Sequence, residues 1–358
     1  MLAFFTKIGL MLTTALLAVA VAASAAESSS TLKAIDLYRS NKLTVGQVRD
    51  ALGPVLDNYL RRRDEKGRKE LEAKVRAAFP SAFFSLSDKS YVTEDVRHSY
   101  LTFDVVDAAD AGSRMPFFKP PQGKVADPDG VLAHWRRYAA LGEAASRRGE
   151  ISVVDHPNCP GFYCLWGSPT PEFASLEQSF VSGAAGRRQE LQEVQAKDAD
   201  PDNRAAAVYV LSYSSDGAVA VESALSSLKD PAEQVRGAGL FVLADVALYH
   251  KGAFIDVSRV LPVLDYPTVS ERSKALSVLV GLGDNPSYKT YLVGRAGPYL
   301  LALLRLKQPA NHDLAFTLLA TLSGKNYGSD DLDAWTKWAE SQAQGPQPVL
   351  SGVTVETR

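Results

Sequence analysis

The sequence has no excess of either charge and few of the residues that usually carry out chemistry. Its 358 residues include 39 lysines and arginines against 41 aspartates and glutamates, which gives a formal net charge of -2. A chain so close to neutrality is not a general binder of polyanions, so we expect no nucleic-acid partner. The five histidines form no motif and are scattered at His98, His134, His156, His250 and His312.

The common motifs of catalysis are also missing. The sequence contains no glycine-rich phosphate loop, no His-Glu-x-x-His and no Gly-x-Ser-x-Gly. A missing motif does not rule out an enzyme, but it leaves no specific reaction to propose. We therefore expect a protein that is not an enzyme and that holds neither a cofactor nor a metal.

A long apolar run occurs only near the N-terminus. Lys7 is the single charge of the first 26 residues, Ile8–Ala22 is apolar, and Ala23-Ser24-Ala25 has the small-x-small form of a signal-peptidase site. A retained membrane anchor is the alternative, because Ile8–Ala26 holds 19 uncharged residues. The polar stretch that follows has no flanking basic residue and favours cleavage. We expect an exported protein, periplasmic or secreted, with no membrane span after the signal peptide is removed.

Only two cysteines are present, Cys159 and Cys164. In an exported protein such a pair is most often a disulfide, and the intervening Pro160-Gly161 favours a tight turn. A redox dithiol usually has two residues between its cysteines, whereas this pair has four. A zinc site would need a fourth ligand besides His156, and haem attachment needs a histidine where Leu165 stands. The sequence predicts a structural disulfide, with free thiols as the other possibility.

The residues before 150 predict an α+β region. Apolar spacings of three and four predict short helices, with Pro54 in the first turn of a new one, over Leu32–Ser40, Val45–Arg63 and Glu65–Phe79. Aromatic and β-branched residues predict strands over Ala82–Leu86, Ser90–Thr93 and Ser99–Val106. The last strand alternates polar and apolar residues, so we expect it to be half-buried. The loop Met115–Gly123 should pack over this sheet, with a role as a contact site as the alternative.

Further helices are expected after this loop, from Asp127 to about Arg148 and, after Thr170-Pro171, to about Ala196.

Two groups of acids remain as weak candidates for chemistry. The first, which could bind a metal or act as acid and base, is Asp104, Asp107 and Asp110. The second resembles the start of a calcium loop but lacks its closing glutamate, so turn and cap roles explain it better; it is Asp198, Asp200 and Asp202.

A register recurs four times in the C-terminal half. Its segments start at Arg204, Arg236, Arg272 and His312, which lie 32, 36 and 40 residues apart. Three positions after each start stands a small residue, and four and seven positions after it stand larger apolar ones, all on one helix face. The small residues are Ala207, Gly239, Ala275 and Ala315. Self-similarity at this period predicts stacked helical hairpins, an architecture that usually serves as a binding surface.

A proline turn precedes each of the four helices, and a shorter helix such as Val219–Leu228 precedes the turn. The turns are Asp200-Pro201, Asp230-Pro231, Tyr266-Pro267 and Gln308-Pro309. These segments resemble HEAT repeats, in particular the bacterial short form grouped with phycobilin-lyase-like repeats. The pattern Asp-Pro-x-x-x-Val-Arg-x-x-Ala-x-x-x-Leu is met most closely from Asp230 to Leu243, and Trp335 and Trp338 stand where exported HEAT proteins often have a capping end.

The resemblance covers residues 172–343 and implies a role for the arginines. In HEAT repeats an arginine at this position commonly pairs with a turn aspartate of its own or the adjacent repeat. Arg204, Arg236 and Arg272 are therefore expected to be structural, and His312 interrupts a continuous ladder.

The sequence thus predicts a mainly α fold with a HEAT-like α-solenoid of about four helical hairpins. The expected parts are a signal peptide over 1–26, the α+β region over 27–150, a cysteine-containing loop over 151–170, the repeats over 171–343 and a flexible tail over 344–358. The first functional hypothesis is an exported, non-enzymatic scaffold or adaptor that binds a protein or peptide. Its contact surface should be the second helix of each hairpin, over 204–214, 235–249, 271–282 and 311–322. The alternative is a lyase-like or ligand-handling enzyme with its site in the N-terminal region or the cysteine loop.

Overall fold

The computed structural model describes residues 30–40, 42–93, 96–152 and 159–343. The predicted signal peptide, the predicted C-terminal tail and His156 lie outside these residues. Within them the fold is mainly helical, with a small three-stranded sheet. It divides into two compact units: residues 117–260, called here the central unit, and residues 30–116 together with 261–343, called the split unit. The expected α+β region is thus divided at Pro116.

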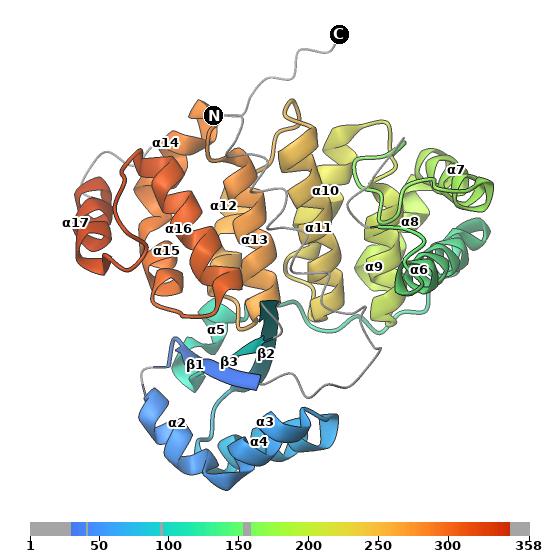
Figure 1. The fold of residues 1–358 in the computed structure, drawn as a ribbon. Helices are drawn as coiled ribbons and strands as arrows, with labels where there is room; N and C mark the ends of the chain where they lie inside the picture. Colours follow the sequence, from blue (N-terminus) through green and yellow to red (C-terminus); the bar gives the residue numbers. More distant parts are fainter. Residues whose placement is uncertain (1–29, 41, 94–95, 153–158, 344–358) are drawn as a thin grey trace. The chain divides into compact units, whose positions relative to one another are not determined.

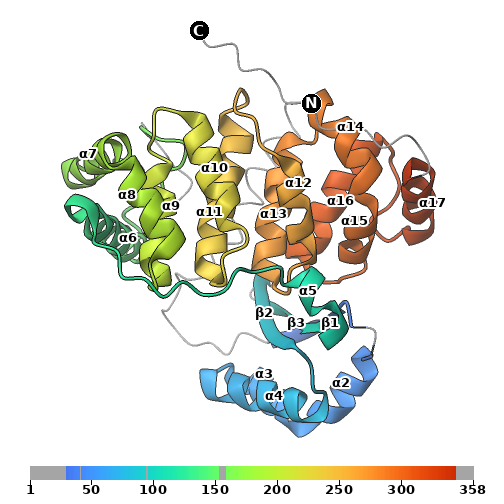
Figure 2. The same ribbon diagram turned by 180° about the vertical axis from the view of Figure 1, so that it is seen from behind.

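The central unit is helical. Its helices are α6 (Val131–Arg147), α7 (Pro171–Gly186), α8 (Arg188–Lys197), α9 (Pro201–Leu211), α10 (Gly217–Ser227), α11 (Glu233–Tyr249) and α12 (Val257–Val260). Side-chain caps begin α9 and α10, because the carboxylates of Asp200 and Asp216 each accept a hydrogen bond from the amide two residues later. Helices α9, α10 and α11 pack against one another side by side (Figure 2).

The helix expected from Pro171 to Ala196 is instead two helices, so that prediction was wrong. Arg187 separates them with a non-helical backbone, and the residues before it, Gly183 to Gly186, are glycine and alanine. Glycine lowers helix propensity because it gains more backbone freedom when the helix opens. Gly183 also allows a close contact, since a Cβ at this position would lie 2.9 Å from a methyl group of Val131.

The split unit combines the sheet with two groups of helices. Its N-terminal elements are β1 (Ser30–Tyr38), α2 (Val45–Leu52), α3 (Pro54–Arg62), α4 (Glu65–Ala78), β2 (Phe83–Thr93), β3 (Val96–Val106) and α5 (Ala111–Arg114). Its C-terminal elements are the 3-10 turn Leu261–Asp265, α13 (Val269–Leu282), α14 (Pro286–Arg295), α15 (Gly297–Leu304), α16 (Pro309–Ser323) and α17 (Leu332–Ala343). Pro54 begins α3 as predicted.

The sheet has the order β1-β3-β2, with β1 parallel and β2 antiparallel to the central β3. Helices α2, α3 and α4 cover one of its faces (Figure 1). The core beneath them contains Leu52, Leu71, Leu101 and Phe103, all fully buried. Polar side chains from β1 and β3 alternate with these core residues and point from the opposite face.

Two predictions for the sheet were wrong. Leu32–Ser40 is not a helix, because its residues pair with β3 after a bulge between Leu32 and Ala34 and alternate between the two faces. The last strand is not half-buried: Leu101, Thr102, Phe103 and Asp104 are all fully buried. A central strand covered on both faces also buries its polar side chains.

Candidate functional site

The recurring arginines are buried, with 2% of Arg204, 4% of Arg236 and none of Arg272 exposed to solvent. Each one stabilises the turn that precedes its own helix, because its Nη1 donates a hydrogen bond to the carbonyl oxygen six residues earlier. The three bonds go to Asp198 at 2.8 Å, Asp230 at 2.7 Å and Tyr266 at 2.7 Å. A common bond of this kind explains why an arginine recurs at this position.

The other guanidinium contacts differ from one arginine to the next. Arg204 donates from Nε and Nη2 to the two carboxylate oxygens of Asp230, both at 2.7 Å. The guanidinium of Arg236 lies over the ring of Phe117, 3.9 Å from the ring centre. The loop Met115–Gly123 was expected to pack over the sheet; for Phe117 this is wrong, because its ring covers an arginine of α11.

Arg272 occupies the most enclosed of these positions. Its Nη1 donates to Asp104 Oδ1 at 2.7 Å, its Nε donates to Asn311 Oδ1 at 3.1 Å, and its guanidinium lies 3.9 Å from the ring centre of Tyr38. Asp104 is fully buried, and this burial outweighs the attraction of the arginine and raises the pKa of the carboxyl to about 6. At His312, where the arginine register ends, Nδ1 lies 2.7 Å from Oδ1 of the adjacent Asp313.

The cysteines are joined in a disulfide, as the sequence predicted. The bridged loop lies against the end of α9: Phe162 donates its amide to Ser212 O at 2.8 Å, and the hydroxyl of Ser212 donates to Tyr163 O at 3.3 Å. A Cβ at Gly161 would lie 3.0 Å from the same Ser212 carbonyl, so only glycine fits there without a shift. Since bridged sulfurs are not free thiolates, this pair performs no thiol chemistry while the bridge is intact.

The weakly favoured acids have local roles. Asp200 caps α9, and Asp198 accepts hydrogen bonds from the amides of Val125 and Asp200, as expected for turn residues. In the other triplet, Asp104 binds Arg272. Among the described residues no group of three or more His, Cys, Asp or Glu side chains could hold a metal ion.

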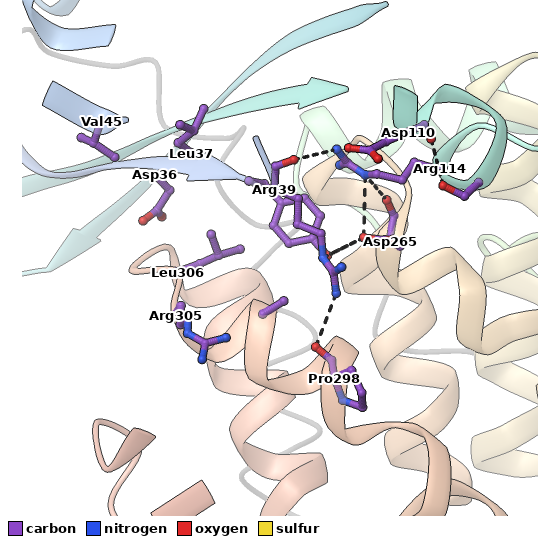
Figure 3. A pocket seen from close by; sticks show the side chains of 13 residues that line it. Asp36, Leu37, Arg39, Val45, Asp110, Arg114, Asp265, Pro298, Arg305 and Leu306 are labelled. Carbon is purple, nitrogen blue, oxygen red and sulfur yellow. Dashed lines mark hydrogen bonds and ion pairs between the residues drawn. The ribbon is translucent and has the colours of Figure 1, made fainter. Parts of the chain in front are cut away.

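A pocket of about 650 Å³ opens in the split unit, in the size range of ligand sites (Figure 3). Its walls come from the end of β1, from α5, from the turn at Asp265 and from α15. Arg39, Arg114 and Arg305 give it three guanidinium groups. We call it the arginine pocket.

Two of the three arginines share one aspartate. The Nε of Arg39 lies 2.9 Å from Asp265 Oδ1, and the Nε of Arg114 lies 3.7 Å from the same oxygen. Arg114 is only 3% exposed and also donates to the carbonyls of Val105 and Arg39, so it fixes the end of β1. Arg39 itself has a left-handed backbone, with φ of 50°, which is uncommon for a residue with a side chain. These contacts hold it there.

Three aspartates, Asp36, Asp110 and Asp265, also line the pocket and match the three arginines in number. Asp36 accepts hydrogen bonds from the amides of Lys307 and Gln308, and burial raises the pKa of its carboxyl. Arg305 is exposed and donates to the carbonyl of Leu301 at 3.4 Å. Asp110 also lines the pocket, and its carboxylate has the opposite charge to the arginines. Arginine and aspartate side chains are equal in number around the pocket, so its charge favours neither an anionic nor a cationic ligand. No local pattern in the sequence predicts this pocket, because its residues come from distant segments.

No family model matches the chain, and neither a curated protein nor a solved structure matches it. Of the helices that are described, none combines the length and the hydrophobicity needed to cross a membrane.

Proposed function

We propose that the chain is an exported, HEAT-like helical scaffold that binds a protein or peptide partner. The observation that carries this proposal is the shared contact of Arg204, Arg236 and Arg272, each of which fastens the turn before its own helix. A buried arginine that recurs at one position and bonds to the preceding turn supports an architecture of stacked helical hairpins. In such an architecture the exposed residues, which lie between the recurring buried positions, determine which partner binds.

The disulfide supports the scaffold over the alternative of a lyase-like enzyme that uses the cysteine loop. Both cysteines are bonded to each other, so neither is a nucleophile in this state. It also supports export, because disulfides persist mainly in oxidising compartments. In the N-terminal region, the fully buried Asp104 forms an ion pair with Arg272. This pairing argues against a role for Asp104 as the catalytic acid of an enzyme.

The proposed contact surface is the exposed part of the four helices α9, α11, α13 and α16. Helices α9, α11 and α13 bury most of their residues, whereas α16 buries a third of its own. In the central unit the ring of Tyr163, from the disulfide loop, stacks on Tyr209 and Phe241 and so covers part of α9 and α11. A partner would therefore contact the residues of these helices that stay at least partly exposed.

Charge changes on those helices test the proposal. The full-length protein would be used to capture partners from the envelope of its own cells, with lysine substituted at Asp202, Gln234, Ser273 and Asp313, one residue on each helix. Loss of the same captured partner in at least one variant is the expected result. The matched control is Glu222→Lys on α10, which should leave capture unchanged. If all four variants capture the same proteins as the unchanged chain, the proposed surface is wrong.

A further inference from the structure

Four aromatic rings from four parts of the central unit form a continuous row. Trp135 of α6 stacks on Tyr209 of α9, with ring centres 4.5 Å apart. Tyr209 stacks on Tyr163 of the disulfide loop at 5.4 Å, and Tyr163 stacks on Phe241 of α11 at 6.2 Å. Tyr209 and Phe241 remain partly exposed, so the row has surface that a ligand can reach.

Asp245 stands one helical turn after Phe241 and on the same face of α11. It is half-buried, and burial raises the pKa of its carboxyl to about 7. Within the described part of the chain its carboxylate has no hydrogen bond and no ion pair. Tyr249, one further turn along, is 69% exposed and extends the same face.

The groups that face Asp245 do not neutralise it. Among the described residues these groups include the phenols of Tyr163 and Tyr249, whose own pKa values are raised by burial and by this carboxylate. His250 follows Tyr249 and packs on the ring of Phe162 at 4.6 Å, and burial lowers the pKa of its imidazole. Burial thus disfavours a positive charge on the histidine, and above pH 7 the described residues of this face carry the Asp245 carboxylate among aromatic rings.

Such a combination attracts a cation for two physical reasons. A carboxylate that is partly withdrawn from water is destabilised unless it is paired, and a cation supplies a partner. The faces of tyrosine and phenylalanine rings attract ammonium and guanidinium groups, more strongly when water is excluded. A metal ion suits the site poorly, because the described residues offer it a single carboxylate there.

We propose that Asp245, with the exposed parts of Tyr209, Phe241 and Tyr249, receives a lysine or arginine side chain of a partner protein. This inference rests on the proposed scaffold function and specifies the chemistry of its partner. The apolar stem of the basic side chain lies along the rings, and its charge meets the carboxylate.

The test uses the full-length protein and a fluorescent pentapeptide, Gly-Arg-Gly-Arg-Gly with blocked ends, measured by fluorescence anisotropy at pH 5.5 and pH 8. Binding at pH 8 is expected to be at least fivefold tighter than at pH 5.5, because the carboxyl loses its proton between these values. Asp245→Asn should weaken binding at pH 8 at least fivefold and remove the pH dependence. A peptide with citrulline in place of arginine keeps the shape without the charge and should not bind.

Two controls keep the result interpretable. Asp284→Asn removes an exposed carboxyl from the split unit and should bind like the unchanged protein. Thermal melting of Asp245→Asn shows whether that variant is folded, and Tyr249→Ala, at an exposed position, gives a second test with an expected loss of at least twofold. Equal binding by Asp245→Asn, equal binding of the citrulline peptide or no binding at pH 8 overturns the inference.

The failure of this inference and that of the scaffold proposal are distinguishable. If the peptide does not bind while the lysine variants on the repeated helices still lose a captured partner, only the cation site is wrong. If the peptide binds through Asp245 but no lysine variant changes capture, the site stands and the wider surface is wrong.

Discussion

The two units use the same arginine position in different ways. In the central unit Arg204 takes its carboxylate from Asp230, in the turn before α11. In the split unit the turn before α16 has Gln308-Pro309 where α11 has Asp230-Pro231, and Arg272 takes its carboxylate from Asp104 on β3. The repeat therefore specifies the arginine and its bond to the preceding turn, while the acid is supplied by whichever element packs there.

The difference in burial makes the second pair the more sensitive one. The side chains of Arg272 and Asp104 are both fully buried, whereas those of Arg204 and Asp230 keep 3% and 9% of their exposure. A buried pair gives little net stability when intact, but removal of one partner leaves an uncompensated charge. A substitution at Asp104 should therefore separate the two pairs most clearly.

Asp104→Leu is expected to cause the largest loss, about 3–5 kcal/mol of unfolding free energy, because Arg272 stays buried without the oxygen that accepts from its Nη1. Asp230→Asn should cost less, since Arg204 keeps its bonds to two turn carbonyls. Urea unfolding followed by circular dichroism measures both. Replacing the pair together, as Asp104→Leu with Arg272→Met, should recover part of the loss. A larger loss for Asp230→Asn would contradict the ranking of the two pairs.

Gly239→Ala tests the small position of the register and is expected to cost about 1–3 kcal/mol through overpacking. A Cβ there would lie 2.4 Å from the carbonyl oxygen of Ala224 on α10. Ala207 of α9 and Ala275 of α13 stand at the same register position and are fully buried, so alanine fits in those helices, whereas the close approach of α10 excludes it from α11. The control is Gly252→Ala, where nothing lies within 4 Å of the added carbon, and thermal unfolding should separate the two variants. Equal stability would show that α10 and α11 can move apart at little cost.

The elements that depend on local sequence patterns could be predicted, and those that depend on contacts between distant segments could not. The helices α9, α10, α11, α13, α15 and α16 follow from local apolar spacing and proline turns, and the disulfide follows from two cysteines five positions apart. The strand β1 and the partner of Arg272 did not follow, because both depend on pairing between distant segments. Asp104 lies 168 residues before Arg272, and no local pattern encodes that distance.

The candidate sites were out of reach for the same reason. The arginine pocket gathers Arg39, Arg114 and Arg305 from three separate segments, and the aromatic row gathers rings from α6, α9, α11 and the disulfide loop. A signal could have been read at Asp245, an acid on the apolar side of a repeated helix. Such a residue stands out because carboxylates are seldom buried without a partner.

Loss of the disulfide is expected to affect the central unit alone. Replacing both Cys159 and Cys164 by serine should cost about 2 kcal/mol, the low end for a bridge because the loop it closes is short. Amide hydrogen exchange, read by mass spectrometry, should show faster exchange in the loop and at the end of α9, where Phe162 bonds to Ser212. Unchanged exchange there, or faster exchange in the split unit, would contradict this assignment.

The smallest expected effect is a pH dependence that differs between the units. Burial raises the pKa of Asp104 to about 6 and that of Asp245 to about 7, from an ordinary value of 3.8. The folded chain thus keeps these protons at pH values where the unfolded chain has lost them, so the unfolding free energy falls as the pH rises from about 4 to about 7. Asp245→Asn should remove the fall between pH 6 and pH 7, and stabilise the protein by about 1 kcal/mol at pH 8 after allowance for its partial exposure.

Urea unfolding at pH 5, 6, 7 and 8 measures this dependence, with Asp284→Asn as the matched control that should follow the unchanged protein. The two acids contribute in different windows, because Asp104 has lost its proton by pH 7 while Asp245 is only half ionised there. A basic peptide bound at Asp245 would lower the pKa of that carboxyl. The pH range over which Asp245 changes the unfolding free energy would then move to lower pH, whereas the range for Asp104 would not change. If the peptide shifted neither window, Asp245 would be a buried acid of the helical frame and not a contact for a partner.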